Sequence, residues 1–218
     1  THRDKVCVAY PHFIDTKRFS IRKTVTEREQ LVGFVGRLRL SKGPLELARA
    51  IPLILANRPE MRFVFIGDGP LKVQIREELE ASGCIRNVTL MGWVSNESMP
   101  DYLNQMKFHI LPSYSETVGW ANLEAMACGA IVIANAVGGI PEIVRDGETG
   151  FLLRDNSPEE IANKLLAVWE HPNLHSIQLQ ARAMVEREFN YDRAVESWSH
   201  LLQRAMYGDL SEEPNQGK

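Results

Sequence analysis

Residues 109–134 read HILPSYSETVGWANLEAMACGAIVIA and contain the pattern that decides the fold. Two short apolar runs, at residues 109–111 and 131–134, enclose a polar loop and a helical stretch at residues 120–128. The helical stretch ends at Gly129, and glycine is the residue type that most often ends a helix. Short apolar runs without polar alternation are typical of strands buried on both faces. The stretch therefore predicts a strand–helix–strand unit of a parallel sheet.

The same alternation extends along most of the chain. Residues 70–82 place Leu71, Ile75 and Leu79 on one helical face, and the pair Ser157-Pro158 has the N-cap and first-turn proline that open another helix. The chain is expected to be helical after Phe151. This repetition predicts an α/β fold, a Rossmann-like doubly wound parallel sheet with helices on both faces. The other predicted strands are residues 6–10, 30–35, 62–66 and 88–91.

Composition narrows the class of protein. The 218 residues are 44% hydrophobic and 24% charged, which is typical of a folded domain and excludes a disordered or coiled-coil chain. A net charge of -3 argues against nucleic acid as a partner. The cysteines Cys7, Cys84 and Cys128 lack the spacing of a zinc site or a disulfide framework, so a reduced, cytoplasmic setting is expected. We find neither a membrane-spanning run nor a signal peptide, which favours a soluble protein.

The loop after the strand at residues 30–35 carries two cations. Gly36 and Gly43 allow tight turns, while Arg37 and Lys42 would bring a guanidinium and an ammonium to one place. This combination suits a diphosphate. The spacing alone is more typical of surface cations on a solvated loop.

The next loop along the chain contains Gly67 and Gly69, followed by Pro70. A dinucleotide fingerprint of the form GxGxxG would require glycine where Lys72 stands, so the signal for NAD is weak. A tight turn into a helix is the alternative interpretation.

The loop and helix start at residues 116–124 carry the strongest signal. Gly119 would direct the free backbone amides of a helix start at an anion. Glu116 could reach the hydroxyls of a sugar, and Glu124 could bind a ribose diol. Two carboxylates at this spacing are also compatible with an acid/base pair of the kind that glycosidases use, or with ordinary charges near a helix start.

Several motifs follow one another in a fixed order. In that order they resemble the C-terminal, donor-binding half of a GT-B fold retaining glycosyltransferase of family 4, also called group 1. The resemblance covers residues 8–206, and a Glu-x7-Glu element that continues into Glu-Ala-Met-Ala-Cys-Gly is its most specific part. The motifs are Gly36-Arg37 with Lys42-Gly43, Gly67-Asp68-Gly69-Pro70, Met91-Gly92-Trp93-Val94, Glu116 with Glu124 to Gly129, Gly138-Gly139-Ile140-Pro141-Glu142, and Gly147-x-Thr149-Gly150-Phe151-Leu152.

The resemblance implies a domain organisation and a reaction. Residues 1–29 would be the last strand of a preceding domain and an interdomain connector, residues 30–207 the nucleotide-sugar binding domain, and residues 208–218 a polar tail. The chain would be one half of a GT-B enzyme that transfers a hexose from a nucleoside-diphosphate sugar with retention of configuration. As an isolated fragment it would be inactive.

The resemblance also implies a role for each matching residue. Arg37, Lys42 and Glu116 would be catalytic, with the two cations neutralising the departing diphosphate. The chain has no Asp-x-Asp motif, so the resemblance implies a metal-independent enzyme without a cofactor beyond its UDP-, GDP- or ADP-sugar donor. The donor-binding residues would be Gly36, Arg37, Lys42, Gly67, Gly92, Trp93, Val94, Glu116, Thr117, Val118, Gly119 and Glu124.

The implied partners are a nucleotide sugar, an N-terminal acceptor domain missing from this chain, and a lipid-linked or polysaccharide acceptor at the membrane surface. The protein would be cytoplasmic, with peripheral membrane attachment through the acceptor domain left open. Three other functions stay open beside this one: an NAD-dependent oxidoreductase, a nucleotide-sugar epimerase of the same fold, and a non-catalytic nucleotide-sugar binding module.

Overall fold

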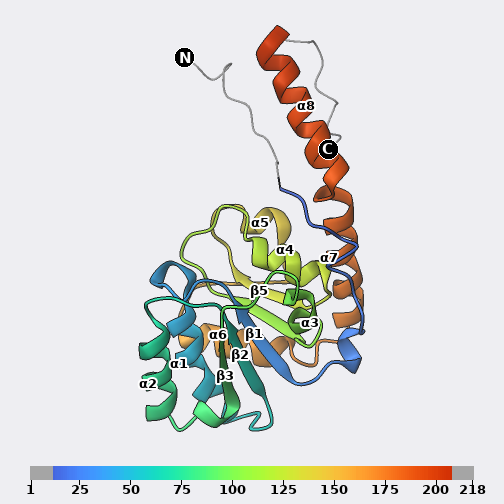
Figure 1. The fold of residues 1–218 in the computed structure, drawn as a ribbon. Helices are drawn as coiled ribbons and strands as arrows, with labels where there is room; N and C mark the ends of the chain where they lie inside the picture. Colours follow the sequence, from blue (N-terminus) through green and yellow to red (C-terminus); the bar gives the residue numbers. More distant parts are fainter. Residues whose placement is uncertain (1–11, 208–218) are drawn as a thin grey trace.

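The computed structural model describes residues 12–207, and a six-stranded sheet forms the centre of the molecule (Figure 1). Every neighbouring pair of strands is parallel. The strand order β3-β2-β1-β4-β5-β6 means that the chain begins in the middle, winds to one edge and then winds to the other. This is the doubly wound fold that the alternation predicts. The strands are β1 (Leu31–Val35), β2 (Arg62–Ile66), β3 (Val88–Gly92), β4 (Phe108–Leu111), β5 (Ile131–Asn135) and β6 (Phe151–Leu153).

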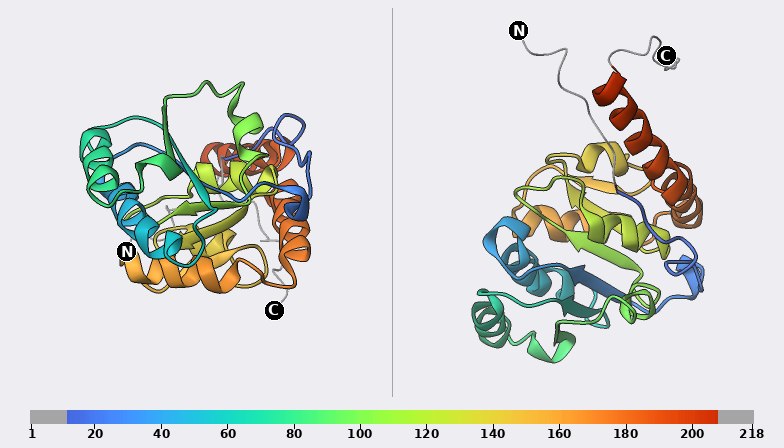
Figure 2. Two further views of the ribbon diagram at one scale, coloured as in Figure 1. Left: turned by 90° about the horizontal axis from the view of Figure 1, so that it is seen from below. Right: turned by 45° about the horizontal axis from the view of Figure 1, so that its top comes forward.

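Helices cover both faces of the sheet (Figure 2). One apolar core lies under α1, α2 and α6, and the other lies under α3, α4 and α5. Helix α7 passes the edge of the sheet and contributes side chains to both cores. These helices are α1 (Pro44–Leu55), α2 (Lys72–Ala81), α3 (Met99–Leu103), α4 (Trp120–Ala127), α5 (Ile140–Ile143), α6 (Pro158–Val168) and α7 (Leu174–Glu188).

Two interior strands, β4 and β5, explain why the sequence shows apolar runs instead of alternation. Every residue of β4 and β5 is buried, because helices lie against both of their faces. Between β1 and β2, the rings of Phe34 and Phe65 stack with centroids 5.6 Å apart. The edge strand β3 alternates between half-buried and exposed positions until Gly92, as expected where helices cover less of the sheet.

The structure corrects one expectation about the C-terminal part. The chain was expected to become helical after Phe151, but Phe151–Leu153 form β6, which pairs with β5 through Ile133 opposite Phe151. A run of three residues is too short for hydrophobic periodicity to distinguish a strand from a helix start. The helix follows at α6, where Ser157 is the N-cap and its hydroxyl accepts from the Glu160 amide, as the sequence indicates. The strand predicted at residues 6–10 and the tail at 208–218 lie outside the described residues.

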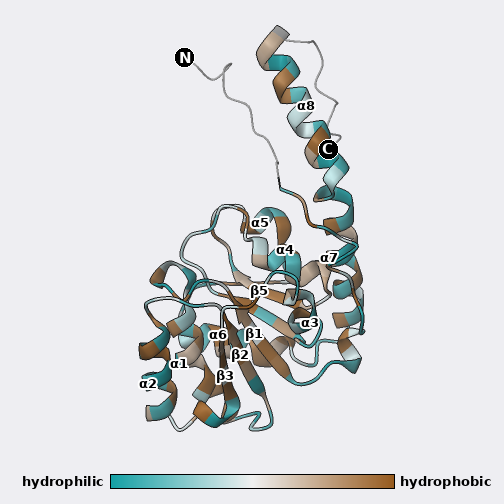
Figure 3. Ribbon diagram, viewed as in Figure 1, coloured by the Kyte–Doolittle hydropathy of each residue, from teal (hydrophilic) through white to brown (hydrophobic). Residues whose placement is uncertain are grey.

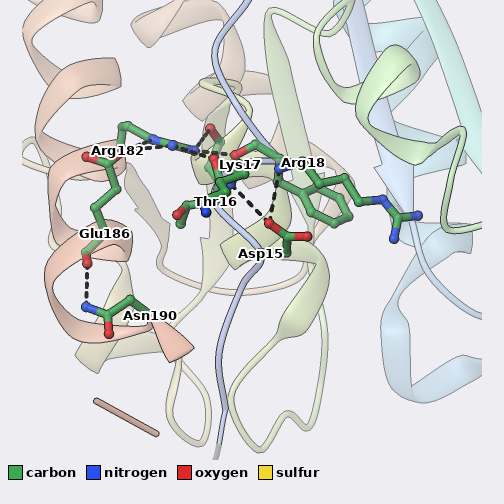
Figure 4. Close-up of polar contacts among 9 residues, drawn as sticks. Asp15, Thr16, Lys17, Arg18, Arg182, Glu186 and Asn190 are labelled. Carbon is green, nitrogen blue, oxygen red and sulfur yellow. Dashed lines mark hydrogen bonds and ion pairs between the residues drawn. The ribbon is translucent and has the colours of Figure 1, made fainter. Parts of the chain in front are cut away.

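Residues 12–29, the expected connector, pack against the domain. Ile14, Phe19 and Val25 are buried in its two cores. Arg182 of α7 holds this segment, because its guanidinium donates to the carbonyl oxygens of Phe19 and, at 2.8 Å, Thr16 (Figure 4). The segment therefore follows the surface of the domain closely.

Arg28 makes a second attachment from the connector side. Its buried guanidinium donates to the carbonyl oxygen of Met106 at 2.7 Å and to that of Cys128, just after α4. Arg182 donates to the Ala127 carbonyl oxygen at 2.7 Å. Two cations thus bind the C-terminal carbonyls of α4, where the helix dipole favours positive charge.

The last helix, α8 (Tyr191–Tyr207), extends away from the body of the molecule (Figure 1). Hydrophobic and hydrophilic stretches of the ribbon alternate along it (Figure 3). The apolar side chains include Trp198, which is 48% exposed, and Leu202, which is 56% exposed. The helix is amphipathic, as the sequence predicts, and much of its apolar stripe faces solvent.

Candidate functional site

A pocket of about 280 Å³ lies at the carboxyl ends of β1 and β4. This is where ligands bind in doubly wound sheets, because the two neighbouring strands lead to helices on opposite faces. The loop after β1 supplies one wall, and the loop after β4 together with the start of α4 supplies the other. The pocket is lined by Val35, Gly36, Lys42, Leu111, Glu116, Thr117, Gly119, Trp120 and Ala121.

Two charged side chains predicted to be catalytic meet in this pocket. The ammonium of Lys42 forms an ion pair with the carboxylate of Glu116, although the residues are 74 positions apart. The side chain of Glu116 is only 7% exposed, and the Ser113 hydroxyl donates to the same carboxylate at 3.0 Å. The pair therefore places one cation and one anion side by side in a partly buried site.

The start of α4 provides hydrogen-bond donors to the same pocket. Gly119 is the N-cap of α4 and has a φ of 76°, a conformation that glycine adopts far more readily than other residues. The amides of Gly119, Trp120 and Ala121 donate no hydrogen bond to any residue between 12 and 207. Free amides at a helix start favour an anion.

A second glycine loop supports the wall that contains Glu116. The Gly139 amide donates to the Thr117 carbonyl oxygen at 2.9 Å. Gly138 has a φ of 55°, and any Cβ there would collide with the Glu116 carbonyl oxygen. Only glycine permits this approach, which explains the Gly-Gly pair that the sequence shows after β5.

Backbone hydrogen bonds connect the loops after β1, β2 and β3. The Gly36 amide donates to the Ile66 carbonyl oxygen at 3.0 Å, and the Gly67 amide donates to that of Gly92 at 2.7 Å. Three of the four predicted donor-binding glycines, Gly36, Gly67 and Gly92, therefore lie in one row at the same edge of the sheet. Beyond Gly92, Trp93 is 77% exposed and Val94 is half-buried.

Seven predicted residues lie outside the lining of this pocket: Arg37, Gly67, Gly92, Trp93, Val94, Val118 and Glu124. The exposed Arg37 side chain makes no ion pair or hydrogen bond with another described residue. Val118 is half-buried against the core under α4. The pocket thus unites Gly36, Lys42, Glu116, Thr117 and Gly119, and leaves the other predicted residues around it.

Glu124 lies one helical turn after Trp120 in α4. Burial raises the pKa of its carboxyl group to about 7, and the nearby charge of Arg18 opposes this shift. Arg18 points away from Arg182, and its Nη2 atom is buried without a hydrogen-bond partner among the described residues (Figure 4). Glu124 therefore loses its proton at a higher pH than an exposed glutamate does.

The sequence did not single out Ser113 or Trp120. Ser113 follows Pro112 at the end of β4, and its position three residues before Glu116 was the only available signal. Trp120 is 43% exposed, and its ring meets that of His12 edge-on at 4.9 Å. Its position directly after a predicted N-cap glycine was the signal that it borders the pocket.

The other titratable residues form no alternative centre. Among residues 12–207 no three His, Cys, Asp or Glu side chains are arranged to hold a metal ion. His109 is buried in β4, as predicted for a packing residue. Burial raises the pKa of the Cys128 thiol to about 12, which fits its interpretation as a small buried side chain and not a nucleophile.

A larger hollow of about 590 Å³ lies on the other side of Tyr114. The Tyr114 hydroxyl donates to the Glu46 carboxylate at 2.9 Å, and Arg49 pairs with Glu78. None of the residues predicted for the site lines this hollow.

Comparison with known proteins gives one consistent result. The family described as "Glycosyl transferases group 1" matches residues 15–184. The D-inositol 3-phosphate glycosyltransferase of Streptomyces scabiei is 32% identical over 183 residues, which cover 80% of this chain and 41% of that protein. An uncharacterized glycosyltransferase of Methanocaldococcus jannaschii is 30% identical over 82% of this chain and 48% of its own length. The chain thus spans less than half the length of these two relatives.

Solved structures agree on the fold. The C-terminal domain of the group 1 family protein LpcC from Francisella tularensis superimposes with a TM-score of 0.71 at 23% identity, over 82% of this chain and 99% of that one. Anabaena HepE, solved with UDP and glucose, gives a TM-score of 0.77 at 21% identity, over 88% of this chain and 55% of that one. In the part of the chain that the structure describes, no helix is both long and apolar enough to cross a membrane.

Proposed function

Since the chain belongs to the group 1 glycosyl transferases, we propose that its pocket between β1 and β4 binds the diphosphate of a nucleotide-sugar donor. The observation that carries this proposal is the convergence of Lys42, Glu116 and the free amides after Gly119 in one pocket. An ammonium and a helix start are the groups that a diphosphate requires. The reaction proposed for the whole protein is transfer of a hexose to an acceptor with retention of configuration.

In this proposal the charge on the leaving group is stabilised by the chain itself. Lys42 and the amides of Gly119 to Ala121 hold the phosphate oxygens, and the exposed Arg37 closes over them from the loop after β1. Fixed donors directed at a developing charge lower the barrier because they need no rearrangement during the reaction. The absence of an Asp-x-Asp motif supports the proposal that no metal ion takes part.

The two carboxylates have different proposed roles. Glu116, with Thr117 and Val118 beside it, binds the hydroxyls of the transferred sugar, because it lies in the pocket before the helix. Glu124 binds the ribose diol one helical turn further on. Gly67 and the Gly92-Trp93-Val94 segment meet the nucleobase, chiefly through backbone groups. The departing diphosphate leaves room for the acceptor to attack from the same face, which gives retention without a covalent intermediate.

The acceptor side is part of the same proposal. An N-terminal domain, in the longer protein that the relatives indicate, supplies the acceptor site. A lipid-linked or polysaccharide acceptor at the membrane surface and a cytoplasmic location accompany it. No cofactor beyond a UDP-, GDP- or ADP-sugar is proposed, and UDP is the first probe because HepE was solved with it.

Isothermal titration of the 218-residue chain with UDP, GDP, ADP and their sugars tests the proposal. We expect one diphosphate to bind and its nucleoside to bind more weakly, while the chain alone transfers no sugar. Enhanced fluorescence of NADH on mixing, with no diphosphate bound, would instead support a dinucleotide oxidoreductase. Turnover of a nucleotide sugar without an acceptor would support an epimerase.

A further inference from the structure

Two polar side chains are completely buried between β4 and the first turn of α4. His109 and Asn122 are each 0% exposed. The strand register places His109 beside Gly33 of β1, and its ring faces the Gly33 backbone and the Asn122 side chain. The surrounding positions on this face are apolar, including Leu123 and Met126 of α4. The pair is therefore a polar contact inside an apolar core.

None of the four polar atoms in these two side chains makes a well-formed hydrogen bond to a described residue. Buried polar groups nearly always have partners, so an apolar residue at either position would be the simpler choice for packing. Burial lowers the pKa of His109 to about 4, which keeps the ring neutral. A neutral imidazole has one donor and one acceptor nitrogen, which match a backbone carbonyl and an amide NH₂.

Asn122 links this pair to the pocket. Its backbone amide donates to the Gly119 carbonyl oxygen at 2.9 Å. A Cβ at Gly119 would lie 2.9 Å from Asn122 Nδ2 and 2.6 Å from Ile140 Cδ1. The Asn122 side chain thus lies directly against Gly119, while neither Asn122 nor His109 lines the pocket.

We propose that His109 and Asn122 are positioning residues that hold the first turn of α4 against β4 and so direct the amides of Gly119 to Ala121 at the donor's phosphates. The two side chains do so through the polar contact between the neutral ring and the Asn122 amide group, and through the contact of the ring with the Gly33 backbone. This role rests on the proposed function. It concerns the orientation of the phosphate-binding amides and involves no contact with the nucleoside.

The test compares phosphate-dependent binding in matched variants. Asn122→Leu and His109→Phe remove the polar contact at similar volume, and His109→Gln keeps a group that pairs with Asn122. Gln178→Leu is the control, because Gln178 is a buried polar residue of α7 that donates to the Gly129 carbonyl oxygen at 2.9 Å, at the other end of α4. Each variant is titrated with UDP, GDP, ADP and the three nucleosides, and its thermal midpoint is recorded.

We expect Asn122→Leu and His109→Phe to weaken diphosphate binding about tenfold and nucleoside binding less than about twofold. His109→Gln should recover most of the diphosphate affinity, and Gln178→Leu should lower the midpoint without changing the ratio of the two affinities. The positioning role would be overturned if the folded apolar variants lost affinity equally for the diphosphate and the nucleoside, or lost no diphosphate affinity. If both apolar variants fail to fold, Asn122→Ser decides by the same ratio, while His109→Gln is still expected to keep most of the diphosphate affinity. A wild-type chain that binds none of the diphosphates refutes the proposed function, and the positioning role fails with it.

Discussion

Lys42 and Glu116 form an ion pair whose carboxylate is almost fully shielded from solvent. Each side chain neutralises the charge of the other. Removing one of them would leave an unpaired charge in a partly buried site, which costs free energy. A bound diphosphate would add negative charge beside the pair, and the free amides after Gly119 would share it. The effect of a substitution on diphosphate affinity therefore depends on whether it removes the positive or the negative charge of the pair.

Replacing Lys42 by Ala is expected to weaken diphosphate binding by about 1.5–3 kcal/mol, or roughly 10- to 150-fold, because a charge-assisted contact is lost and Glu116 then repels the phosphates. Arg37→Ala should act in the same direction. Calorimetry with a nucleoside diphosphate measures the effect. Lys164→Ala on α6 is the control, and the nucleoside should bind all variants alike. A loss that is equal for nucleoside and diphosphate would mean that Lys42 acts through folding.

Replacing Glu116 by Gln should not weaken diphosphate binding, in contrast to Lys42→Ala. The substitution removes the anion paired with Lys42, so diphosphate binding should stay the same or become tighter. Binding of the cognate nucleotide sugar should weaken, because a carboxylate accepts sugar hydroxyls more strongly than an amide does. Titration with both ligands checks this, and equal weakening of the two would contradict the assignment of Glu116 to the sugar.

Glu124 gives a prediction about pH. Its pKa is raised from 4.5 to about 7, so the unfolded chain ionises at a lower pH than the folded one. The stability that this residue contributes is complete below about pH 4.5 and is lost as the pH rises through 7. Glu124→Gln should therefore raise the free energy of unfolding at pH 8 by up to about 3 kcal/mol and leave it unchanged near pH 4.

Urea denaturation of both proteins at the two pH values measures this difference. The same substitution should lower the affinity for a nucleoside diphosphate and for the corresponding nucleotide sugar by similar factors, because both ligands carry the ribose diol. A variant that is no more stable at pH 8 than at pH 4, relative to wild type, would show that the carboxyl group is not desolvated.

At the scale of elements, helix α4 has a different function at each end. Its first turn directs free amides into the pocket, and its last carbonyls accept from Arg28 and Arg182. Both arrangements follow the direction of the helix dipole. The two ends of α4 are therefore suited to bind opposite charges.

Gly119→Ala tests the first turn of α4. A side chain at a φ of 76° costs on the order of 1–2 kcal/mol and would also lie 2.6 Å from Ile140 Cδ1. We expect lower stability together with loss of diphosphate binding. Ser157→Ala is the matched control, since loss of the α6 N-cap costs about 1 kcal/mol and Ser157 does not line the pocket. Denaturation and calorimetry on both variants separate the effects, and retained binding in Gly119→Ala would contradict a role for these amides.

The sequence predicts the elements that carry the site better than the contacts within it. The glycine at the end of α4 and the apolar runs before and after this helix were sufficient to predict β4, α4 and β5. The short strand β6 was missed, because three residues carry no period. The pairing of Lys42 with Glu116 depends on β1 and β4 being neighbours, and the polar contact of His109 with Asn122 depends on their depth in the core. Neither the order of the strands in the sheet nor the depth of a residue in the core can be derived from the local spacing of residues.

At the scale of the whole molecule, α8 leaves an apolar stripe exposed. Replacing both Trp198 and Leu202 by Ser should change the free energy of unfolding by less than about 0.5 kcal/mol, because these side chains contribute little to the core. The same change should reduce self-association, since exposed apolar patches promote it. Urea denaturation and sedimentation velocity check the two outcomes. A large loss of stability would show that the stripe packs against this domain in solution.

The attachment of residues 12–29 has a mechanical consequence. Arg182 binds the carbonyls of Thr16 and Phe19 together with that of Ala127, so the connector and the end of α4 share one guanidinium. Helix α4 has eight residues and begins directly after Gly119. A displacement of the connector therefore acts on the C-terminal end of α4 through the Arg182 guanidinium. Moving the connector away from the domain would break these hydrogen bonds or displace the C-terminal end of α4 together with it.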